Sequence, residues 1–236
     1  MVTRWLKERR REPELMDQPD LDPALHHQAL AGLTRVNAFS GTASSLWGPI
    51  SNLAHRSGGP IRVLDVASGG GDVAIGLAQR SQQSGLPVAV DGCDMSDVAL
   101  AYAQQRADAR KLQVNFLKAD VLADPLPAGY DVICCSLFLH HFDPPEVIQL
   151  LSAMRDSGAK LIVISDLLRT QFGYLMCWAG IRLLTRSRIC HVDGPLSVQG
   201  AFTRSELREL ADRGGLQGMV LKNIWPQRLL MTWERS

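Results

Sequence analysis

Three consecutive glycines, Gly69 to Gly71, follow an apolar segment over residues 61–66 that includes Asp65. The nearly continuous apolar run is typical of a parallel strand covered on both faces. Glycines have no Cβ atom and let a ligand approach the main chain closely. A helix that begins near Asp72 would point its unpaired N–H groups at the same space. The pattern predicts a ligand site at the carboxyl end of this strand.

The charge of this turn bears on the type of ligand. Gly69, Gly71 and Ala74 have the G-x-G-x-x-A spacing of dinucleotide-binding proteins, which alone is a weak signal. A pyrophosphate at a helix N-terminus would be repelled by Asp65 and Asp72. S-adenosylmethionine (SAM) has a sulfonium and an ammonium group and no phosphate, so the same acids would attract it. The turn therefore favours SAM, with a nicotinamide dinucleotide as the alternative.

Two further carboxylates follow the next predicted strands. Asp94 ends a strand over residues 87–94, where its side chain can accept both hydroxyls of a ribose. Met95 beside it can lie on an adenine face. Asp120 follows a short strand over residues 114–117 and is placed to accept an adenine amino group.

Four segments resemble the class I SAM-dependent methyltransferases in their order: DVASGGGD, GCDMS, KADVLADPLP and YDVICCSLFLHHF, all within residues 61–166. Ala67 stands where the family usually has its first loop glycine, and Ser68 where it has Cys or Thr. That variant is similar to the ubiquinone and menaquinone biosynthesis methyltransferases. The resemblance implies an α/β, Rossmann-like fold whose seven-stranded sheet is mostly parallel, with an antiparallel last strand.

The resemblance also implies SAM as the cofactor and assigns its contacts. Asp65, Ala67, Gly69 and Gly71 would surround the methionine part, Asp94 the ribose, and Asp120 with Val121 the adenine. We add Ser68, in the turn, and Ser136, which ends the fourth predicted strand, to this set of contacts.

Residues 1–57 are predicted to form a charged arm and a helical lid, ahead of a SAM-binding region over residues 58–236, with a single domain overall. The arm, with the sequence RWLKERRREPE, is expected to be a frayed, solvated terminus rather than a nucleic-acid site. Its dominance by charge also argues against a signal peptide.

Two helices are predicted in the lid. Asp22 and Pro23 have the residue types that begin a helix, which runs to about Phe39, and a second helix follows Gly41. In the family such a helical piece usually covers the cofactor. Arg35 and Asn37 would then reach its carboxylate, or else be ordinary exposed helix polars.

The second half predicts a helix over residues 144–154, capped by Asp143, a strand over 161–166, a helix over 205–213 and a terminal hairpin over 219–233. An apolar helix over residues 171–184 is a helical insertion after the fifth strand. It is too short to span a bilayer, so no membrane insertion is expected. We interpret it as a wall of the core or of a substrate pocket, with an interfacial anchor as the alternative.

Histidine is the natural base for removing a proton near neutral pH. His140 and His141 follow the fourth predicted strand, and because neighbouring side chains point different ways, only one is expected to face the site. His191 with Asp193 would form an oriented base if the segment ICHVDGPLS folded over the cleft, but a turn around residues 193–195 is favoured.

No metal site is predicted. The magnesium-dependent small-molecule methyltransferases place carboxylates after the fourth and fifth strands, whereas the fourth strand here ends at Ser136 and leaves Asp166 alone. Asp166 is still placed to touch the substrate. The five cysteines show no C-x-x-C pairing, and Cys134 and Cys135 are interpreted as small core residues.

Composition restricts the function further. A chain of 236 residues that is 46% hydrophobic can bury one sizeable core, and a net charge of +1 gives no general attraction to nucleic acid. The cysteine usage is that of a reducing cytoplasm. We expect a methyltransferase of secondary metabolism that acts on the oxygen or carbon of an aromatic, polyketide or quinone-like small molecule. The alternatives are an NAD(P)-dependent oxidoreductase and a non-catalytic binding module of the same fold.

Overall fold

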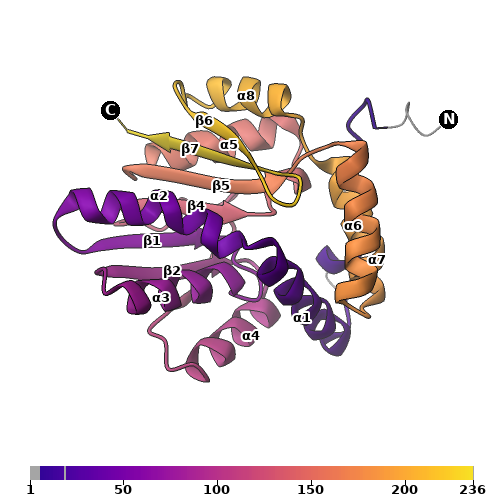
Figure 1. The fold of residues 1–236 in the computed structure, drawn as a ribbon, viewed down its shortest axis with the longest axis horizontal. Helices are drawn as coiled ribbons and strands as arrows, with labels where there is room; N and C mark the ends of the chain where they lie inside the picture. The colour runs from indigo at the N-terminus through magenta and orange to yellow at the C-terminus, as the bar shows by residue number, and fades with distance from the viewer. Residues whose placement is uncertain (1–5, 19, 236) are drawn as a thin grey trace.

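The computed structural model describes residues 6–18 and 20–235, and its centre is a seven-stranded sheet of order β3-β2-β1-β4-β5-β7-β6 (Figure 1). Strands β1 to β5 are parallel, and β7 is antiparallel to both β5 and β6. The predicted fold class, including the antiparallel last strand, is confirmed. The strands are β1 (Ile61–Val66), β2 (Val88–Asp94), β3 (Phe116–Lys118), β4 (Val132–Ser136), β5 (Leu161–Leu167), β6 (Val220–Ile224) and β7 (Arg228–Glu234).

Helices cover both faces of the sheet and its carboxyl edge. Among the described residues, no helix is both long and apolar enough to cross a lipid bilayer. The helices are α1 (Pro23–Ser40), α2 (Thr42–Ser57), α3 (Asp72–Ser84), α4 (Asp97–Asp108), α5 (Pro144–Asp156), α6 (Gln171–Leu184), α7 (Arg188–Gly200) and α8 (Arg204–Arg213), with short 3-10 turns η1 (Leu15–Asp17) and η2 (Leu139–His141).

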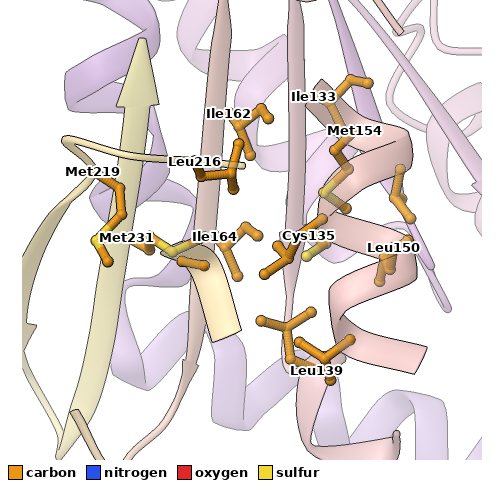
Figure 2. Close-up of a cluster of buried hydrophobic side chains, with 14 of the residues drawn as sticks. Ile133, Cys135, Leu139, Leu150, Met154, Ile162, Ile164, Leu216, Met219 and Met231 are labelled. Atoms are coloured by element: carbon orange, nitrogen blue, oxygen red, sulfur yellow. The ribbon is translucent and has the colours of Figure 1, made fainter. Parts of the chain in front are cut away.

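The central strands are apolar because each face of them is buried under helices. On one face, Leu150 and Met154 of α5 lie over Cys135 of β4 within a core cluster that also includes residues of β5 and α8 (Figure 2). On the other face, α2 and α3 pack on the sheet. Cys134 belongs to one cluster and Cys135 to the other, and burial raises the pKa of both thiols. The prediction that they are core residues is confirmed.

The predicted helix boundaries in the lid also hold. The Asp22 carboxylate accepts the N–H groups of Ala24 and Leu25, and Gly41 ends α1 with a φ of +64°. Helix α5 begins with the expected cap, because Asp143 and Glu146 form a capping box.

The N-terminal arm is not the frayed terminus that its charge predicted. Leu6 is buried, and the Arg9 guanidinium donates to the carbonyl groups of Gly200, His140 and Phe142. Arg11 forms an ion pair with Asp143. The arginines therefore bind main-chain acceptors of the same molecule, which local sequence cannot indicate. Residues 4 and 5 of the predicted arm lie outside the described residues.

The predicted turn around residues 193–195 is wrong, because these residues lie inside helix α7. The buried side chains of Ile189, Cys190 and Val198 hold α7 in place despite Pro195. Gly194 is needed for this packing, since a Cβ atom there would lie 2.0 Å from Ile181 Cδ1 of α6. Tertiary contacts have overridden the local preference of Gly and Pro for a turn.

This contact predicts opposite effects of two glycine substitutions. Gly194→Ala should lower the free energy of unfolding by about 1–2 kcal/mol, because overpacking against Ile181 outweighs the gain in helix propensity. Gly180→Ala in α6 is the matched control, since a Cβ atom there meets no atom within 4 Å. It should raise stability by about 0.5–1 kcal/mol. Urea denaturation of both variants would contradict the account if Gly194→Ala were neutral or stabilising.

Candidate functional site

The glycine turn after β1 has a left-handed backbone and open space beside one of its glycines. Gly69 and Gly71 have φ values of +49° and +74°. A Cβ atom on Gly71 would lie 2.8 Å from Phe116 Cζ, whereas one on Gly69 would meet no atom within 4 Å. Gly71 is thus required for packing, and Gly69 leaves the main chain accessible to a ligand.

Two residues other than glycine also adopt the left-handed conformation at this edge. Ala67 has a φ of +53° after β1, and Leu137 has a φ of +52° after β4. Each conformation costs about 1 kcal/mol or more for a residue with a Cβ atom. Strands β1 and β4 are neighbours at the point where the strand order reverses, which is where open α/β sheets bind ligands. The strain therefore coincides with the expected site.

Asp65 lies beneath the turn rather than in the open space. It is 1% exposed, and its Oδ2 accepts the Ala74 N–H of helix α3 at 3.1 Å. Burial raises the pKa of Asp65 to about 8. The carboxyl group is therefore largely protonated at neutral pH. A cation bound nearby would favour its ionised form and would be attracted to it only after the proton is released.

Asp72 is neutralised by partners within the protein. It forms an ion pair with Arg106, which also donates to the Gly70 carbonyl. Asp72 also accepts hydrogen bonds from Thr34 Oγ1 at 2.8 Å and from Asn37 Nδ2 at 3.3 Å, both on α1. The acid that was expected to act on the ligand instead joins helix α1 to the turn.

The two lid residues therefore differ in their availability. The Asn37 amide is engaged with Asp72. Arg35 is exposed on α1, and among residues 6–18 and 20–235 no hydrogen bond or ion pair partner of its guanidinium is seen.

The acids after β2 and β3 stand at the same edge as the turn. Asp94 Oδ2 accepts the Gly69 N–H at 2.8 Å, and its Oδ1 accepts the Ser96 N–H at 2.9 Å. The exposed Asp120 caps the following turn by accepting the Leu122 N–H. The remaining lone pairs of both carboxylates can still accept hydrogen bonds from a ligand.

Four other predicted contacts surround this edge. Met95 is exposed, and Val121 packs against the core. Ser136 ends β4 beside Ser165 of β5. Ser68 Oγ is buried in the turn and has no hydrogen-bond partner among residues 6–18 and 20–235, which is uncommon for a buried hydroxyl and leaves a donor for a ligand.

A buried pair of side chains lies at the ends of β4 and β5. His140 in η2 and Asp166 in β5 have their Nδ1 and Oδ1 atoms 2.6 Å apart, and the His140 N–H donates to Asp166 Oδ2 at 3.2 Å. Burial alone would raise the pKa of Asp166, but the charge and hydrogen bond of His140 outweigh it and lower that pKa. The carboxylate holds a proton on Nδ1 and fixes the orientation of the ring, so that Nε2 points toward Glu14 of the arm.

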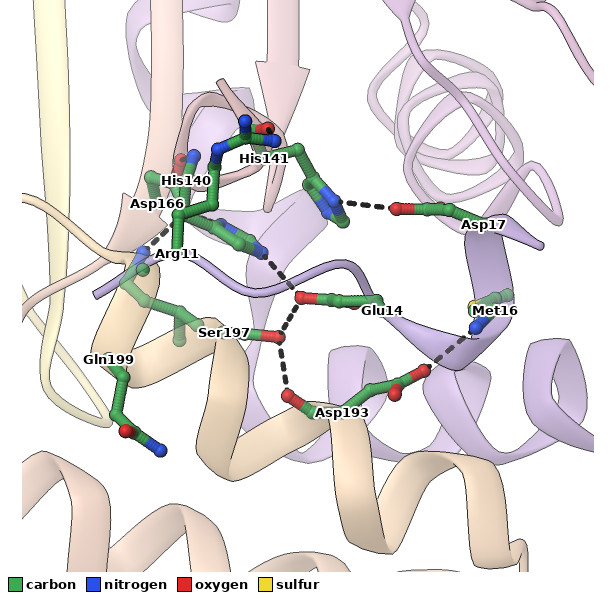
Figure 3. Close-up of polar contacts among 12 residues, drawn as sticks. Arg11, Glu14, Met16, Asp17, His140, His141, Asp166, Asp193, Ser197 and Gln199 are labelled. Atoms are coloured by element: carbon green, nitrogen blue, oxygen red, sulfur yellow. Dashed lines mark hydrogen bonds and ion pairs between the residues drawn. The ribbon is translucent and has the colours of Figure 1, made fainter. Parts of the chain in front are cut away.

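The arm places two acids against these histidines (Figure 3). Glu14 Oε1 lies 3.7 Å from His140 Nε2, and Asp17 Oδ2 lies 3.0 Å from His141 Nδ1. Burial lowers the pKa of His141, but the hydrogen bond that its ring donates to Asp17 and the charge of Glu14 raise it to about 9. Sequence reasoning missed Glu14 and Asp17, because nothing in a charged arm marks which residues fold back.

The two histidines do not point to opposite sides as expected. Their ring centroids are 4.4 Å apart, because they lie in the tight turn η2 rather than on a strand. Donor atoms of Glu14, His140 and His141 lie within 4.8 Å of one another and could offer a metal site. Tetrahedral ligands at about 2.0–2.1 Å from zinc are only about 3.3 Å apart. The existing hydrogen bonds account for this cluster without a metal.

His191 and Asp193 do not form an oriented base. His191 Nε2 lies 2.8 Å from the Thr185 carbonyl oxygen. Asp193 accepts the N–H groups of Leu15 and Met16, and burial raises its pKa to about 6. These two residues anchor helix α7 and the arm and do not face the glycine turn together.

Helix α6 has two apolar faces. One face lines a cavity of about 80 Å³ between α1, α6 and the connection of β6 to β7. The other face is exposed through Phe172, Leu175, Trp178 and Leu183. The prediction of a pocket wall therefore applies to one face only. Arg228, which sequence reasoning did not consider, lines the same cavity.

Comparisons with known proteins agree with this geometry. Residues 63–158 match a family described as a methyltransferase domain. The chain is 36% identical over 107 residues to a demethylmenaquinone methyltransferase of Thermus thermophilus, covering 44% of this chain and 47% of that protein. It is 30% identical over 128 residues to a ubiquinone biosynthesis O-methyltransferase of Pseudomonas entomophila, covering 53% and 52%. The chain thus spans about half the length of the curated relatives it matches.

Solved structures share the fold at low sequence identity. Human N-acetylserotonin methyltransferase in complex with SAM has a TM-score of 0.66 at 15% identity, covering 91% of this chain and 57% of that one. The magnesium protoporphyrin IX methyltransferase of Synechocystis with bound S-adenosylhomocysteine has a TM-score of 0.53 at 18% identity, covering 90% and 84%. By its sheet order, the family match over residues 63–158 and these relatives, the chain has the fold of the class I SAM-dependent methyltransferases and is similar over about half of its length to those of menaquinone and ubiquinone biosynthesis.

Proposed function

We propose that this chain transfers a methyl group from SAM to the oxygen or carbon of an aromatic, polyketide or quinone-like small molecule. The observation that carries the proposal is the position of the His140–Asp166 pair at the same sheet edge as the glycine turn. A cofactor cradle and an oriented base at one edge are the parts that methyl transfer to an acidic oxygen or carbon needs. The names of the curated relatives favour a quinone-like acceptor.

The turn fits the cofactor in three respects. The backbone at Gly69 is open, the Ser68 hydroxyl lacks a partner, and Asp94 stands beside the turn with free lone pairs. In this proposal Ala67, Ser68, Gly69 and Gly71 hold the methionine part over Asp65. Asp94 holds the ribose, and Asp120, Val121, Met95 and Ser136 line the remaining positions. SAM supplies a methyl group that is activated by its sulfonium charge.

His140 acts as the general base in this proposal. Its Nε2 takes the proton of the acceptor, while the Asp166 carboxylate holds the ring orientation and stabilises the resulting imidazolium. His140 is 4% exposed, since the arm lies over it. Exclusion of water by the arm strengthens the interaction between the imidazolium and Asp166.

Residues 1–57 act as an arm and lid over a SAM-binding region that comprises residues 58–236. Support comes from the hydrogen bonds that join Thr34 and Asn37 of α1 to Asp72 beside the turn. Because Asn37 is bound to Asp72, Arg35 is the residue of the two that is proposed to reach the carboxylate of the cofactor.

Calorimetry with SAM, S-adenosylhomocysteine and NADPH tests the proposal against its alternatives. Binding of SAM and S-adenosylhomocysteine without NADPH is the expected result. Binding of NADPH alone would favour the oxidoreductase. Cofactor binding without transfer of a labelled methyl group to a panel of phenols, quinols and polyketides would favour the non-catalytic module.

The pKa of Asp65 predicts a pH-dependent affinity for SAM. Because a cation favours the ionised carboxyl, binding should release a proton below pH 8. The affinity should therefore rise roughly tenfold or more between about pH 6.5 and 8.5. Asp65→Asn should remove both this rise and the proton release, which calorimetry in buffers of different ionisation enthalpy measures. An unchanged pH profile in the variant would contradict the role of Asp65.

The stability of the ligand-free protein provides the control. The folded-state pKa of Asp65 lies above its unfolded value of about 4, so the folded protein binds the extra proton between those pH values. The contribution of Asp65 to stability is complete below about pH 4 and is lost as the pH rises through about 8. Asp65→Asn should remove this decline. If stability declines with rising pH while the affinity for SAM stays constant, Asp65 is buried but its ionisation is not coupled to cofactor binding.

The base assignment predicts a separation of turnover from cofactor binding. His140→Ala and Asp166→Asn should each lower kcat by roughly 10²–10⁴-fold and leave the affinity for S-adenosylhomocysteine nearly unchanged. His191→Ala is the matched control, because His191 contacts the Thr185 carbonyl of its own segment, and it should keep full turnover. Full activity of His140→Ala would contradict a role as base and would attribute catalysis to the positioning of the acceptor next to SAM.

A further inference from the structure

Arg228 is a buried cation without a carboxylate partner. It begins β7 opposite Leu167 of β5 and is 3% exposed. Its Nη1 donates to Thr42 Oγ1, the one hydrogen bond seen for this guanidinium in residues 6–18 and 20–235. No carboxylate in that part of the chain lies within 4.0 Å of it. Most of its five N–H donors are therefore available.

Asp166, the carboxylate whose charge acts on Arg228, already has hydrogen-bond donors of its own. Asp166 acts on Arg228 through its charge, but its oxygens accept from His140 Nδ1, from the His140 N–H and from the Leu167 N–H. Burial lowers the pKa of Arg228 to about 10, so it remains charged at neutral pH. A buried charge without a counter-ion is costly, and replacement by an apolar residue of similar volume often stabilises a protein. The position calls for an anion that the chain itself does not supply.

The surroundings of Arg228 indicate what carries that anion. Arg228 lines the cavity of about 80 Å³ together with Met176, Cys177 and Ile181 of α6. A water occupies about 30 Å³ in the liquid, so the cavity accommodates a small charged group and the start of an apolar skeleton. Beside the cavity, Phe39 and Trp225 are 59% and 60% exposed, with ring centroids 6.3 Å apart. An apolar body with one anionic end matches these surfaces.

We infer that Arg228 binds a carboxylate on the methyl acceptor, which is therefore an apolar acid rather than a neutral phenol or quinol. A guanidinium accepts a carboxylate through two parallel N–H···O bonds, and this geometry fixes orientation as well as position. Arg228 pairs with Leu167 at the carboxyl end of β5, so it lies at the same sheet edge as Asp166, on the opposite face of the strand. This inference rests on the proposed function, because it names the acceptor of that same site.

Cinnamate and cinnamyl alcohol test the inference, since they share one skeleton and differ in the charge of one end. In the presence of S-adenosylhomocysteine, the wild-type protein should bind cinnamate at least tenfold more tightly than the alcohol. Arg228→Met should abolish this preference, and Arg228→Lys should keep part of it. Arg182→Met removes an exposed arginine that stacks on Trp178, and this control should leave the preference unchanged.

The outcomes separate this inference from the proposed function. Failure of the wild-type protein to bind S-adenosylhomocysteine refutes the methyltransferase proposal whatever cinnamate does. If S-adenosylhomocysteine binds but cinnamate does not bind, or binds no better than the alcohol, the carboxylate inference is overturned and the methyltransferase proposal stands. Persistence of the preference in Arg228→Met also overturns it. If Arg228→Met does not fold, Arg228→Gln, which keeps a polar group for Thr42, makes the same comparison.

Discussion

The hydrogen-bonded carboxylate of Asp166 holds the candidate site together. It accepts the side chain and main chain of His140 and the N–H of Leu167, so it joins the turn η2 after β4 to the end of β5. Its negative charge survives burial because the histidine donates to it. Both the orientation of the base and the isolation of Arg228 follow from this use of its oxygens. Loss of this one group would leave His140 without a fixed tautomer.

The carboxyl edge of the sheet carries the remaining constraints. The chain leaves β1 through Ala67 and β4 through Leu137, two non-glycine residues held in left-handed conformations. Such conformations persist where the surrounding structure determines them. Here the parallel ladder of β1 and β4 and the buried residues below the edge fix the strand ends, so the turns that follow have little freedom. These fixed turns shape the space above the sheet, and a fixed binding surface reduces the reorganisation needed on binding.

The features that could be predicted from the sequence depend on residues close together in the chain, such as helix caps, or on the periodic pattern of one helix or strand. The strand before Asp65, the caps Asp22 and Asp143, and the antiparallel end of the sheet follow from pattern and family resemblance. Helix α7 could not be predicted in this way, because the packing of Gly194 against Ile181 joins two separate helices. The arm was missed for the same reason, since Arg9 binds carbonyl groups more than 130 residues away.

The electrostatic role of a charged residue was the property that the sequence predicted least well. Asp65 and Asp72 look alike as acids beside a glycine turn, yet burial raises the pKa of Asp65 while Asp72 is paired with Arg106. Neither presents a fixed negative charge to a ligand, so cofactor selectivity must come from ionisation of Asp65 on binding and from Asp94 at the neighbouring strand end. Arg228 is the opposite case, a buried cation with no carboxylate partner in the described part of the chain. The site thus has one acid, Asp65, whose ionised form a bound cation favours, and one cation, Arg228, whose charge a bound anion compensates. Ligands that satisfy both groups would gain affinity from both interactions.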